Sequence, residues 1–537
     1  MGIFLNPDTP SEAYKSIALT RFFVDKTWLI HDILESLKLD NQRYICITRP
    51  RRFGKTVMAN MLGAFFGKTT NCHSLFEHLE ISKSDYFHQY CCNSDIIYID
   101  FSRIPEKCSS YEEYISRILS GLKEDLHQEF PSLVLNFKKS LWDILSTIFE
   151  KTQRKFVFIM DEWDAIFHLP FISSKEERMY LLFLKNLLKD QSYIQLAYMT
   201  GILPIAKYSD GSELNMFAEY NMATKEKFSS YFGFLNHEVD TLFSIYQKTT
   251  KKPKITREEL QIWYDGYHTA AGDHIYNPKS IIHALSDNQL GCYWTGSGPY
   301  DEIFYYIQDN IDEIRDDFVW MISGEAVETK IQEYAATAKD LTTREQIYSA
   351  MVVYGLLTYE HQKVFIPNRE LMEKYNELLL SNKKLGYIYR LARESSKMLK
   401  ATLSGDAQKM AEILKFAHDT ETPILSYNSE IELSAIVNLT YLSARNKYRV
   451  EREDKAGEGY VDFIFYPENH HDDAIILELK IDSTPEQAIQ QIKTKNYAAR
   501  FIGKLGEDAK YTGRILAVGI SYSRHTKEHV CKVEVLQ

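Results

Sequence analysis

Residues 49–56 read "RPRRFGKT" and end in the tripeptide that closes a phosphate-binding loop. The usual pattern is Gly, any four residues, then Gly-Lys-Ser/Thr, and here Arg49 stands in place of the first glycine. The apolar run "RYICIT" (43–48) precedes the loop, and "VMANMLGAFF" follows it with helical spacing. Because backbone N–H groups and a helix N-terminus attract phosphates, this stretch predicts a strand–loop–helix unit that binds phosphate.

Each residue of this loop has an expected role. Pro50 has no N–H, so the donors must come from residues 51–56. Lys55 is expected to neutralise the β- and γ-phosphates, and the Thr56 hydroxyl to bind Mg²⁺. We assign nucleotide binding to Arg51, Arg52, Phe53, Gly54, Lys55 and Thr56. Arg51 and Arg52 either add charge at the phosphates or face a neighbouring subunit or nucleic acid, and a chance Gly-Lys-Thr remains the alternative for the loop itself.

A second motif follows the loop at the distance that a nucleotide site needs. The apolar strand in "FVFIMDE" ends in Asp161, a ligand for Mg²⁺, and Glu162, a group that activates water. Another strand candidate (95–102) lies between the motifs, and a fourth (194–201) ends near Thr200, where such ATPases sense the γ-phosphate. Strands that alternate with helical stretches predict a parallel α/β sheet, with ATP and Mg²⁺ as cofactors.

The pattern of the chain changes twice after this sheet. Residues 1–234 form the predicted nucleotide-binding region, and 235–427 consist mostly of helical runs with one candidate hairpin (355–368). Residues 428–537 give a helix, three strands, a helix and a last strand. We therefore predict an α/β protein with a P-loop sheet, a helical middle region and a second α/β domain.

The last region carries the acids of a metal-dependent hydrolase. Asp462 lies in "GYVDFIFY", and Glu478 and Lys480 lie in "IILELKI". Residues i and i+2 of a strand share a face, so Glu478 and Lys480 point the same way, while Leu477, Leu479 and Ile481 point into the core. Asp462 on the adjacent strand reaches the same metal, and phosphodiester cleavage needs such a group of carboxylates. The alternative is a solvated strand face with a salt bridge.

Other polar residues of this region are weaker candidates. Gln491 is a catalytic candidate on the following helix, with Gln490 as the register alternative. Glu432 is either a further acid of the site or, more simply, a surface helix charge. The turn with His470, His471, Asp472 and Asp473 resembles a metal cluster, although an exposed turn explains it better.

Basic residues in this region either grip phosphates or form solvated faces, because acids are equally frequent there. They are Arg445, Lys447, Arg449, Arg452, Lys493, Lys495 and Arg500.

Several short motifs, in their order, resemble the AAA-ATPase-like family that carries a C-terminal PD-(D/E)XK nuclease domain. They are "TRPRRFGKT", "IMDEWD", "MTGILPIAK", "YFGF", "WYDGY", "YNPKSI", "YGLLTY" and "IPNREL". The resemblance runs from "FFVDKTWLI" (22–30) to about residue 500. It implies that a replaced first glycine is the usual pattern, so that Arg49 is not a departure peculiar to this chain, and that "FFVDKT" approaches the nucleotide base. Trp163 stands where the family often has Tyr, and Val461 replaces the leading proline of the nuclease motif.

Composition limits the function classes without choosing one. The chain of 537 residues, with 45% hydrophobic and 26% charged residues, is long enough for two to four globular domains. Its net charge of −11 neither indicates nor excludes nucleic-acid binding. The seven cysteines form no CxxC pair, which favours reduced thiols in the cytoplasm. We find no signal peptide and no apolar run of membrane length, and so expect no membrane partner.

Together these features predict a nucleotide-regulated or ATP-dependent nuclease that hydrolyses phosphodiester bonds in DNA or RNA. One alternative is an NTPase switch whose nuclease-like domain only binds nucleic acid or a partner protein. Another is a catalytically idle scaffold. If the AAA-like resemblance extends to mechanism, the chain forms a homo-oligomer in which a neighbour completes the ATP site.

Overall fold

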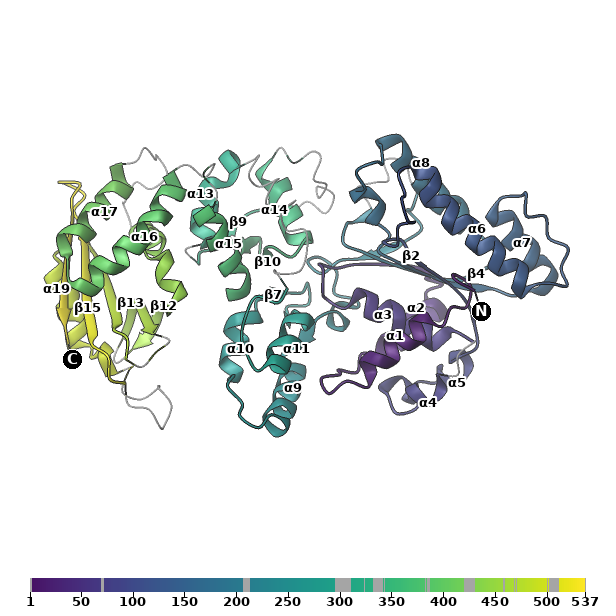
Figure 1. Ribbon diagram of the computed structural model, residues 1–537, viewed down its shortest axis with the longest axis horizontal. Coiled ribbons are helices and arrows are strands. Elements are labelled where there is room, and N and C mark those ends of the chain that lie inside the picture. Colours follow the sequence, from purple (N-terminus) through teal and green to yellow (C-terminus); the bar gives the residue numbers. More distant parts are fainter. Residues whose placement is uncertain are drawn as a thin grey trace. The chain divides into compact units, whose positions relative to one another are not determined.

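The phosphate loop follows one strand of a five-stranded parallel sheet in the computed structural model, and Figure 1 shows this sheet with its helices. The strand order is β2-β3-β4-β1-β5, and every neighbouring pair is parallel. The strands are β1 (Tyr44–Thr48), β2 (Asp95–Asp100), β3 (Phe156–Asp161), β4 (Ile194–Gly201) and β5 (Ala218–Tyr220). The four predicted strands are confirmed, and β5 is an addition.

The structure describes the following residues: 2–68, 72–205, 213–294, 311–322, 324–331, 341, 343–381, 383, 387–419, 430–456, 459–467, 469, 471–499, 501 and 511–536.

Helices cover both faces of this sheet, which explains why its strands are continuous apolar runs. On β3, Phe156 and Phe158 belong to one core cluster, and Val157 and Ile159 belong to another. The first cluster includes α6 (Tyr111–Glu129), α7 (Leu141–Thr152) and α8 (Ser174–Leu188). The second includes α2 (Trp28–Leu39) and α3 (Lys55–Phe66), on the opposite side of the sheet (Figure 1).

The chain divides into two compact units. One consists of Met1–Tyr306 with Glu328–Leu371, and the other of Ile307–Val327 with Met372–Gln537. The first unit therefore contains the nucleotide-binding sheet and much of the predicted middle region. The boundaries at residues 234 and 427 stay a prediction.

The middle part of the first unit is mostly helical. The helices α9 (Asn236–Thr249), α10 (Arg257–Tyr264) and α11 (Pro278–Asp287) share one apolar cluster with Phe22. A small sheet in the order β6-β8-β7 lies among them, formed by β6 (Phe234–Leu235), β7 (Tyr267–His268) and β8 (His274–Tyr276). The predicted hairpin is confirmed as the antiparallel pair β10 (Thr358–Glu360) and β11 (Lys363–Phe365).

The second unit is built on a mixed sheet in the order β12-β13-β14-β15-β16. Its strands are β12 (Tyr448–Ala456), β13 (Gly459–Pro467), β14 (Ala474–Ile481), β15 (Ile515–Tyr522) and β16 (His529–Val535). The helices α18 (Glu430–Thr440) and α19 (Pro485–Thr494) occupy the predicted places in the chain. The predicted element order is confirmed up to β15, and β16 is an additional strand, antiparallel to β15. Within the described part of the chain, we find no helix with the length and apolarity that crossing a membrane requires.

Candidate functional site

The phosphate loop joins β1 to α3 and has two residues in the left-handed region. Gly54, at φ 93°, precedes the first helical residue, Lys55. Arg52 is also left-handed, at φ 70°. Positive φ values re-aim successive peptide groups, and a turn of this kind forms the concave surface that binds anions. The exposed side chain of Arg52 and the half-buried side chain of Arg51 belong to the same loop.

Lys55 is buried, and it folds back onto the loop that precedes it. Its Nζ donates to the carbonyl oxygens of Arg49 (2.9 Å) and Pro50 (3.0 Å). Burial lowers the pKa of Lys55, whereas the nearby carboxylates of Glu162, Asp164 and Asp161 raise it. Lys55 therefore sits with its charge solvated by main-chain dipoles, next to the position that the sequence assigns to phosphate.

Arg49 has a structural environment that the sequence did not reveal. Its side chain is only 1% exposed, and Nη1 donates to the carbonyl oxygens of Thr48 (2.8 Å) and Tyr220 (2.7 Å). The guanidinium lies over the ring of Phe232, and burial lowers the pKa of Arg49 to about 10. Arg49 thus connects the end of β1 to β5, so the residue that replaces the first glycine acts as an anchor for the loop.

Asp161 and Thr200 meet beside the loop because β3 and β4 are parallel neighbours. The Thr200 hydroxyl donates to Oδ1 of Asp161, which is 1% exposed. Burial raises the pKa of Asp161, and hydrogen bonds from Thr200 and Thr56 oppose this shift. Since Thr56 is the second residue of α3, the structure brings together the predicted Mg²⁺ ligands, Thr56 and Asp161, and the predicted sensor, Thr200.

Glu162 follows Asp161 directly in the chain and takes a left-handed backbone conformation, with φ 52°. Burial raises its pKa, and the charge of Lys55 opposes this shift. Its half-buried carboxylate is therefore close enough to Lys55 for the two charges to interact, as a group that activates water at the phosphates must be.

Asp164 contributes to the site and was missed by the sequence analysis. It is 1% exposed, and its Oδ2 accepts from the N–H groups of Ile202 (2.9 Å) and Leu203 (2.8 Å). It therefore fixes the loop that follows β4 and Thr200. The only available signal was its position, three residues after Asp161. Trp163, between these acids, packs so closely on Gly201 that a Cβ there would lie 2.4 Å from the indole ring.

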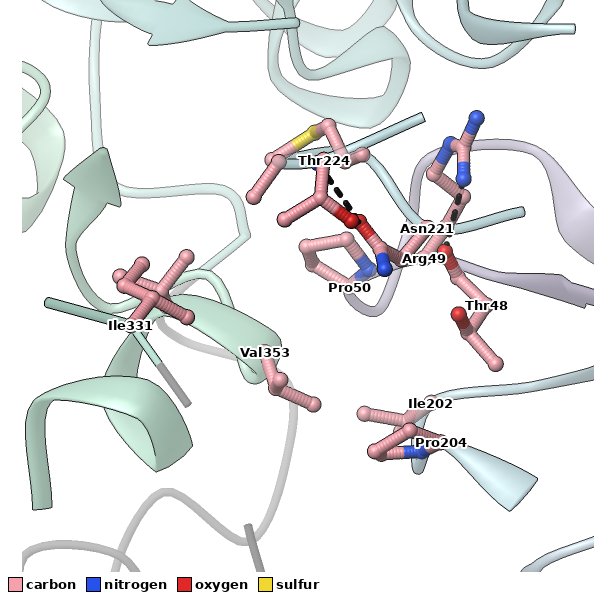
Figure 2. Close-up of a pocket in the computed structure, with 12 residues that line it drawn as sticks. Thr48, Arg49, Pro50, Ile202, Pro204, Asn221, Thr224, Ile331 and Val353 are labelled. Carbon is pink, nitrogen blue, oxygen red and sulfur yellow. Dashed lines mark hydrogen bonds between the residues drawn. The ribbon is translucent and has the colours of Figure 1, made fainter. Parts of the chain in front are cut away.

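An apolar pocket lies beside the start of the loop. Figure 2 shows Pro50, Ile202 and Pro204 on one side of it and Ile331 and Val353 on the other. The described residues that line this pocket do not include Lys55, Thr56 or Asp161. Among the loop residues, the pocket is thus lined by Arg49 and Pro50 and not by the candidate phosphate-binding groups.

The segment "FFVDKT" is held by the middle region. Phe22 packs in the cluster of α9, α10 and α11, and Lys26 Nζ donates to Glu238 Oε2 on α9 (2.7 Å). Its approach to the nucleotide base stays a prediction.

In the second unit, the predicted acids and lysine lie together on β13 and β14. Glu478 is 3% exposed because α19 covers its face of the sheet. Lys480 Nζ lies 3.1 Å from Glu478 Oε1, and the Gln491 side chain on α19 donates to the same oxygen. Asp462 Oδ2 accepts from the backbone N–H of Leu479 (2.6 Å), which ties β13 to β14 between the two other residues.

The electrostatics of this site centre on Glu478. Burial and the negative charge of Asp462 raise the pKa of Glu478 to about 7, and Lys480 opposes this shift. Glu478 Oε2 is buried and has no hydrogen-bond partner in the described part of the chain. Two carboxylates that repel each other, one with a buried free oxygen, are the donor set that a divalent cation prefers. The residues present therefore fit a metal ion held by Asp462 and Glu478.

Four further residues of the second unit bear on this site. Gln490 is exposed and donates to Thr494, so Gln491 is the glutamine that faces the acid. Tyr497, missed by the sequence analysis, is buried with its hydroxyl 3.5 Å from Gln491 Nε2. Glu432 lies on α18, which packs against β14, and its role stays a prediction. Ile481, expected in the core, is half-exposed.

Most of the candidate phosphate-gripping cations have partners within the chain. Arg449 pairs with Glu451, Arg452 with Glu325, and Lys493 with Glu534. Arg445 donates to Asn438, whereas Arg500 lies outside the described residues. The internal pairs support the interpretation of solvated faces for these three cations.

The acidic turn does not form a metal cluster in the described residues. His471 contacts Thr512, Asp473 pairs with Arg514, and His470 lies outside the described residues. Among the described residues, the one group of three or more histidines, cysteines or acids whose ligand atoms lie close enough to share a metal is His31, Asp32 and Glu35, on α2.

Comparisons with known proteins agree with this geometry. Residues 12–209 match the family described as "Predicted AAA-ATPase", and residues 433–526 match the PD-(D/E)XK nuclease superfamily. No curated protein matches the sequence.

Two solved structures resemble the chain loosely. The Walker-type ATPase of Pyrococcus abyssi is 14% identical with a TM-score of 0.37, over 66% of this chain and 99% of that one. The ORC2 protein of Aeropyrum pernix is 10% identical with a TM-score of 0.32, over 66% and 94% of the two chains. From the family matches, the chain combines an AAA-ATPase-like domain with a C-terminal domain of the PD-(D/E)XK nuclease superfamily.

Proposed function

We propose that this protein is a nucleotide-regulated nuclease that hydrolyses phosphodiester bonds in DNA or RNA with a divalent cation. The observation that carries the proposal is the environment of Glu478. This carboxylate is buried beside Asp462, and its Oε2 has no partner among the described residues. Burying a carboxylate oxygen without a donor is costly, and Lys480 and Gln491 both contact the other oxygen, Oε1, so these partners leave Oε2 uncompensated.

The proposal of nucleotide binding is based on residues at the ends of β3 and β4 and at the start of α3. Lys55, Thr56, Asp161, Glu162 and Thr200 come from three separate segments and converge beside the phosphate loop. This set contains a cation for the phosphates, two ligands for Mg²⁺, an acid for water and a polar sensor. We infer that ATP with Mg²⁺ binds here and that Glu162 supports its hydrolysis.

In the nuclease-like site, a bound Mg²⁺ would supply Lewis-acid stabilisation of charge on the scissile phosphate. Asp462 and Glu478 would hold the ion, whose charge would keep Glu478 ionised. Lys480 would then turn its ammonium group toward the phosphate or the attacking water, because Glu478 shares its charge with the metal. Gln491 would hold Glu478 in position through Oε1, and Tyr497 would support Gln491.

The test is a cleavage assay with plasmid DNA, single-stranded DNA and RNA in Mg²⁺, with and without ATP. We expect at least one substrate to be cut, EDTA to stop the reaction, and Lys480→Ala to lose about 100-fold or more in rate. Lys527→Ala, at an exposed position of the same domain, is the matched control and should cut like the wild type. A Lys480→Ala variant that cuts as fast as the control would place the active site elsewhere.

A second candidate function is an NTPase switch whose C-terminal domain only binds a partner protein. The internal ion pairs of Arg449, Arg452 and Lys493 favour it, because these cations are engaged within the chain and not presented to nucleic acid. In that case the wild type would hydrolyse ATP but cut none of the three substrates in any condition.

A further inference from the structure

Two adjacent cysteines, Cys91 and Cys92, bring their thiols into contact between α5 (Phe87–Tyr90) and β2. The two Sγ atoms lie 3.7 Å apart, which is hydrogen-bonding distance for sulfur. Backbone contacts fix the pair on both sides. The Cys91 N–H donates to the Phe87 carbonyl (2.9 Å), and the Cys92 N–H donates to the Phe65 carbonyl on α3 (2.7 Å). The fold therefore holds two thiols together at this turn.

The two thiols differ in their surroundings. Cys91 is 8% exposed and belongs to the apolar cluster that contains Phe65, whereas Cys92 packs at the margin of this cluster and is only half-buried. Water solvates a charge better than an apolar core does, so the charge of an ionised pair belongs on Cys92 and the remaining proton on Cys91. The Cys91 thiol is then the donor and the Cys92 sulfur the acceptor of their hydrogen bond.

The electrostatic environment favours the same assignment. The hydrogen bond from Cys91 lowers the pKa of Cys92 to about 6, and the backbone N–H groups of Cys72 and His73 and the charge of His73 add to this effect, although burial opposes it. The same hydrogen bond, together with burial, raises the pKa of Cys91. Since the thiolate is the nucleophilic form of cysteine, Cys92 is the reactive member of the pair at neutral pH.

A metal site does not explain the pair. A structural zinc site uses four ligands, and a catalytic one uses three protein ligands. Among the described residues, no further cysteine, histidine or acid has a ligand atom near enough to both thiols to share a metal with them. What the fold supplies here is a dithiol, with one half-buried nucleophile and one buried thiol in contact with it.

We propose that Cys92 is a peroxide-reactive thiolate and that Cys91 is its resolving thiol. Cys92 attacks the O–O bond of a hydroperoxide, which leaves a sulfenic acid on Cys92 and releases hydroxide or an alkoxide that takes a proton from solvent. The Cys91 sulfur then attacks the Cys92 sulfur. The S–O bond breaks, an S–S bond forms, and the hydroxyl leaves with the Cys91 proton as water. The peroxide gains two electrons, and the two thiols lose them.

The disulfide made in this way is easily reversed. The Cα atoms of adjacent residues are about 3.8 Å apart, which is below the roughly 4.4–6.8 Å of ordinary disulfides. Closing the bond therefore strains the turn, and a strained disulfide is readily reduced by other thiols. The site suits a reversible modification and not a permanent link.

The first test treats the reduced full chain with one equivalent of hydrogen peroxide, alkylates the remaining thiols and identifies them by mass spectrometry. We expect the peptide with Cys91 and Cys92 to lose two hydrogen atoms and both alkylation sites, and dithiothreitol to restore them. Cys292 is exposed and Cys108 is half-buried, so both serve as comparators within the same chain and should stay alkylated. Oxidation of either comparator before Cys92 would overturn the proposal.

A second test separates the roles of the two thiols by trapping sulfenic acid with dimedone. In Cys91→Ser the new hydroxyl still donates to Cys92, but no thiol resolves the sulfenic acid. Dimedone labelling of Cys92 should therefore rise at least about tenfold over the wild type. Cys92→Ser should give neither product, and Cys108→Ser is the matched control that should behave like the wild type.

Two outcomes of these experiments would contradict the assignment of roles. A link between Cys92 and Cys72 in the oxidised wild type would show that Cys91 is not the resolving thiol. Oxidation of Cys91 in Cys92→Ser at the wild-type rate would show that Cys92 is not the nucleophile.

Discussion

Lys55 in the phosphate loop and Glu478 in the nuclease-like domain are both buried charges, and the chain stabilises them in different ways. The two hydrogen bonds of Lys55 go to neutral carbonyl groups, and the carboxylates of Glu162, Asp164 and Asp161 interact with its charge from nearby. Glu478 instead shares its Oε1 with a cation, Lys480, and with the Gln491 amide. On the function proposed above, the first site binds an anion, and the second binds a cation held by Glu478 Oε2 and Asp462.

The two sites also differ in how the fold assembles them. The loop site gathers residues from α3, which follows β1, and from the ends of β3 and β4, which meet because parallel strands end at one edge. The nuclease-like site uses two neighbouring antiparallel strands and one helix. The loop site therefore depends on packing between segments far apart in the sequence, including the middle region. The positions of Asp462 and Glu478 depend instead on how two neighbouring strands pair.

The largest expected effect is on ATP hydrolysis. Glu162→Gln should keep MgATP affinity within about threefold but lower the hydrolysis rate about 1000-fold, because the amide cannot accept a proton from water. Phosphate release under saturating MgATP measures this rate. Glu150→Gln, at an exposed position of α7, is the control and should hydrolyse normally. Normal hydrolysis by Glu162→Gln would show that this acid is not the group that activates water.

The next effect is on nucleotide binding. Lys55→Ala should weaken MgATP binding about 100-fold, because it removes the charge solvated by the loop carbonyls and leaves Asp161, Glu162 and Asp164 with less compensation. Lys15→Ala on α1 (Thr9–Ala18) is the exposed control. Affinities that agree within twofold would mean that the loop does not bind phosphate.

A smaller effect concerns metal binding in the nuclease-like domain. Metal ligation needs ionised Glu478, whose pKa is raised to about 7, so Mn²⁺ affinity should be about tenfold weaker at pH 6 than at pH 8. Calorimetry at the two pH values measures it. Glu478→Gln should bind poorly at both, and a wild-type affinity that does not change with pH would remove Glu478 from the metal site.

The same shift has a consequence for stability without metal. The pKa of Glu478 rises from 4.5 to about 7 on folding, so between these values the native state binds more protons than the unfolded state. Stability from this group therefore falls as the pH rises from about 4.5 to 7. Urea unfolding in EDTA should show a weaker fall in Glu478→Gln than in the wild type.

The smallest effect tests how the loop docks onto the middle region. Tyr267→Phe removes the hydrogen bond to the Gly355 carbonyl but keeps the ring against Phe53, and it should cost about 1 kcal/mol of stability. Thermal unfolding measures the change, with Tyr359→Phe as the matched control. A loss no larger than that of the control would show that this hydrogen bond does not stabilise the docking.

Much of the loop site could be predicted because its residues lie in short local motifs. Gly54, Lys55 and Thr56 follow a clear strand, and Asp161, Glu162 and Thr200 end two others, so strand order alone brings them together. Arg49 could not be assigned, since nothing in the sequence shows that its side chain turns back to the carbonyl of Tyr220. The strand β5 was missed because three residues carry no periodicity.

In the C-terminal domain, the alternation of β14 predicts that Glu478 and Lys480 share a face. The burial of that face could not be predicted, because it depends on how α19 packs, and this burial raises the pKa of Glu478. The choice between Gln490 and Gln491 likewise needed the helix orientation. β16 was missed because its exposed and buried positions mix charged and apolar residues.

The most direct test of the central claim, that the nucleotide state at the loop controls cleavage at Asp462, Glu478 and Lys480, is one rate comparison. Cleavage of the best substrate in Mg²⁺ is measured for wild type and Lys55→Ala, each with and without ATP. We predict that ATP changes the wild-type rate at least several-fold and leaves the rate of Lys55→Ala unchanged. A wild-type rate that is the same with and without ATP, and equal to that of Lys55→Ala, would contradict the account.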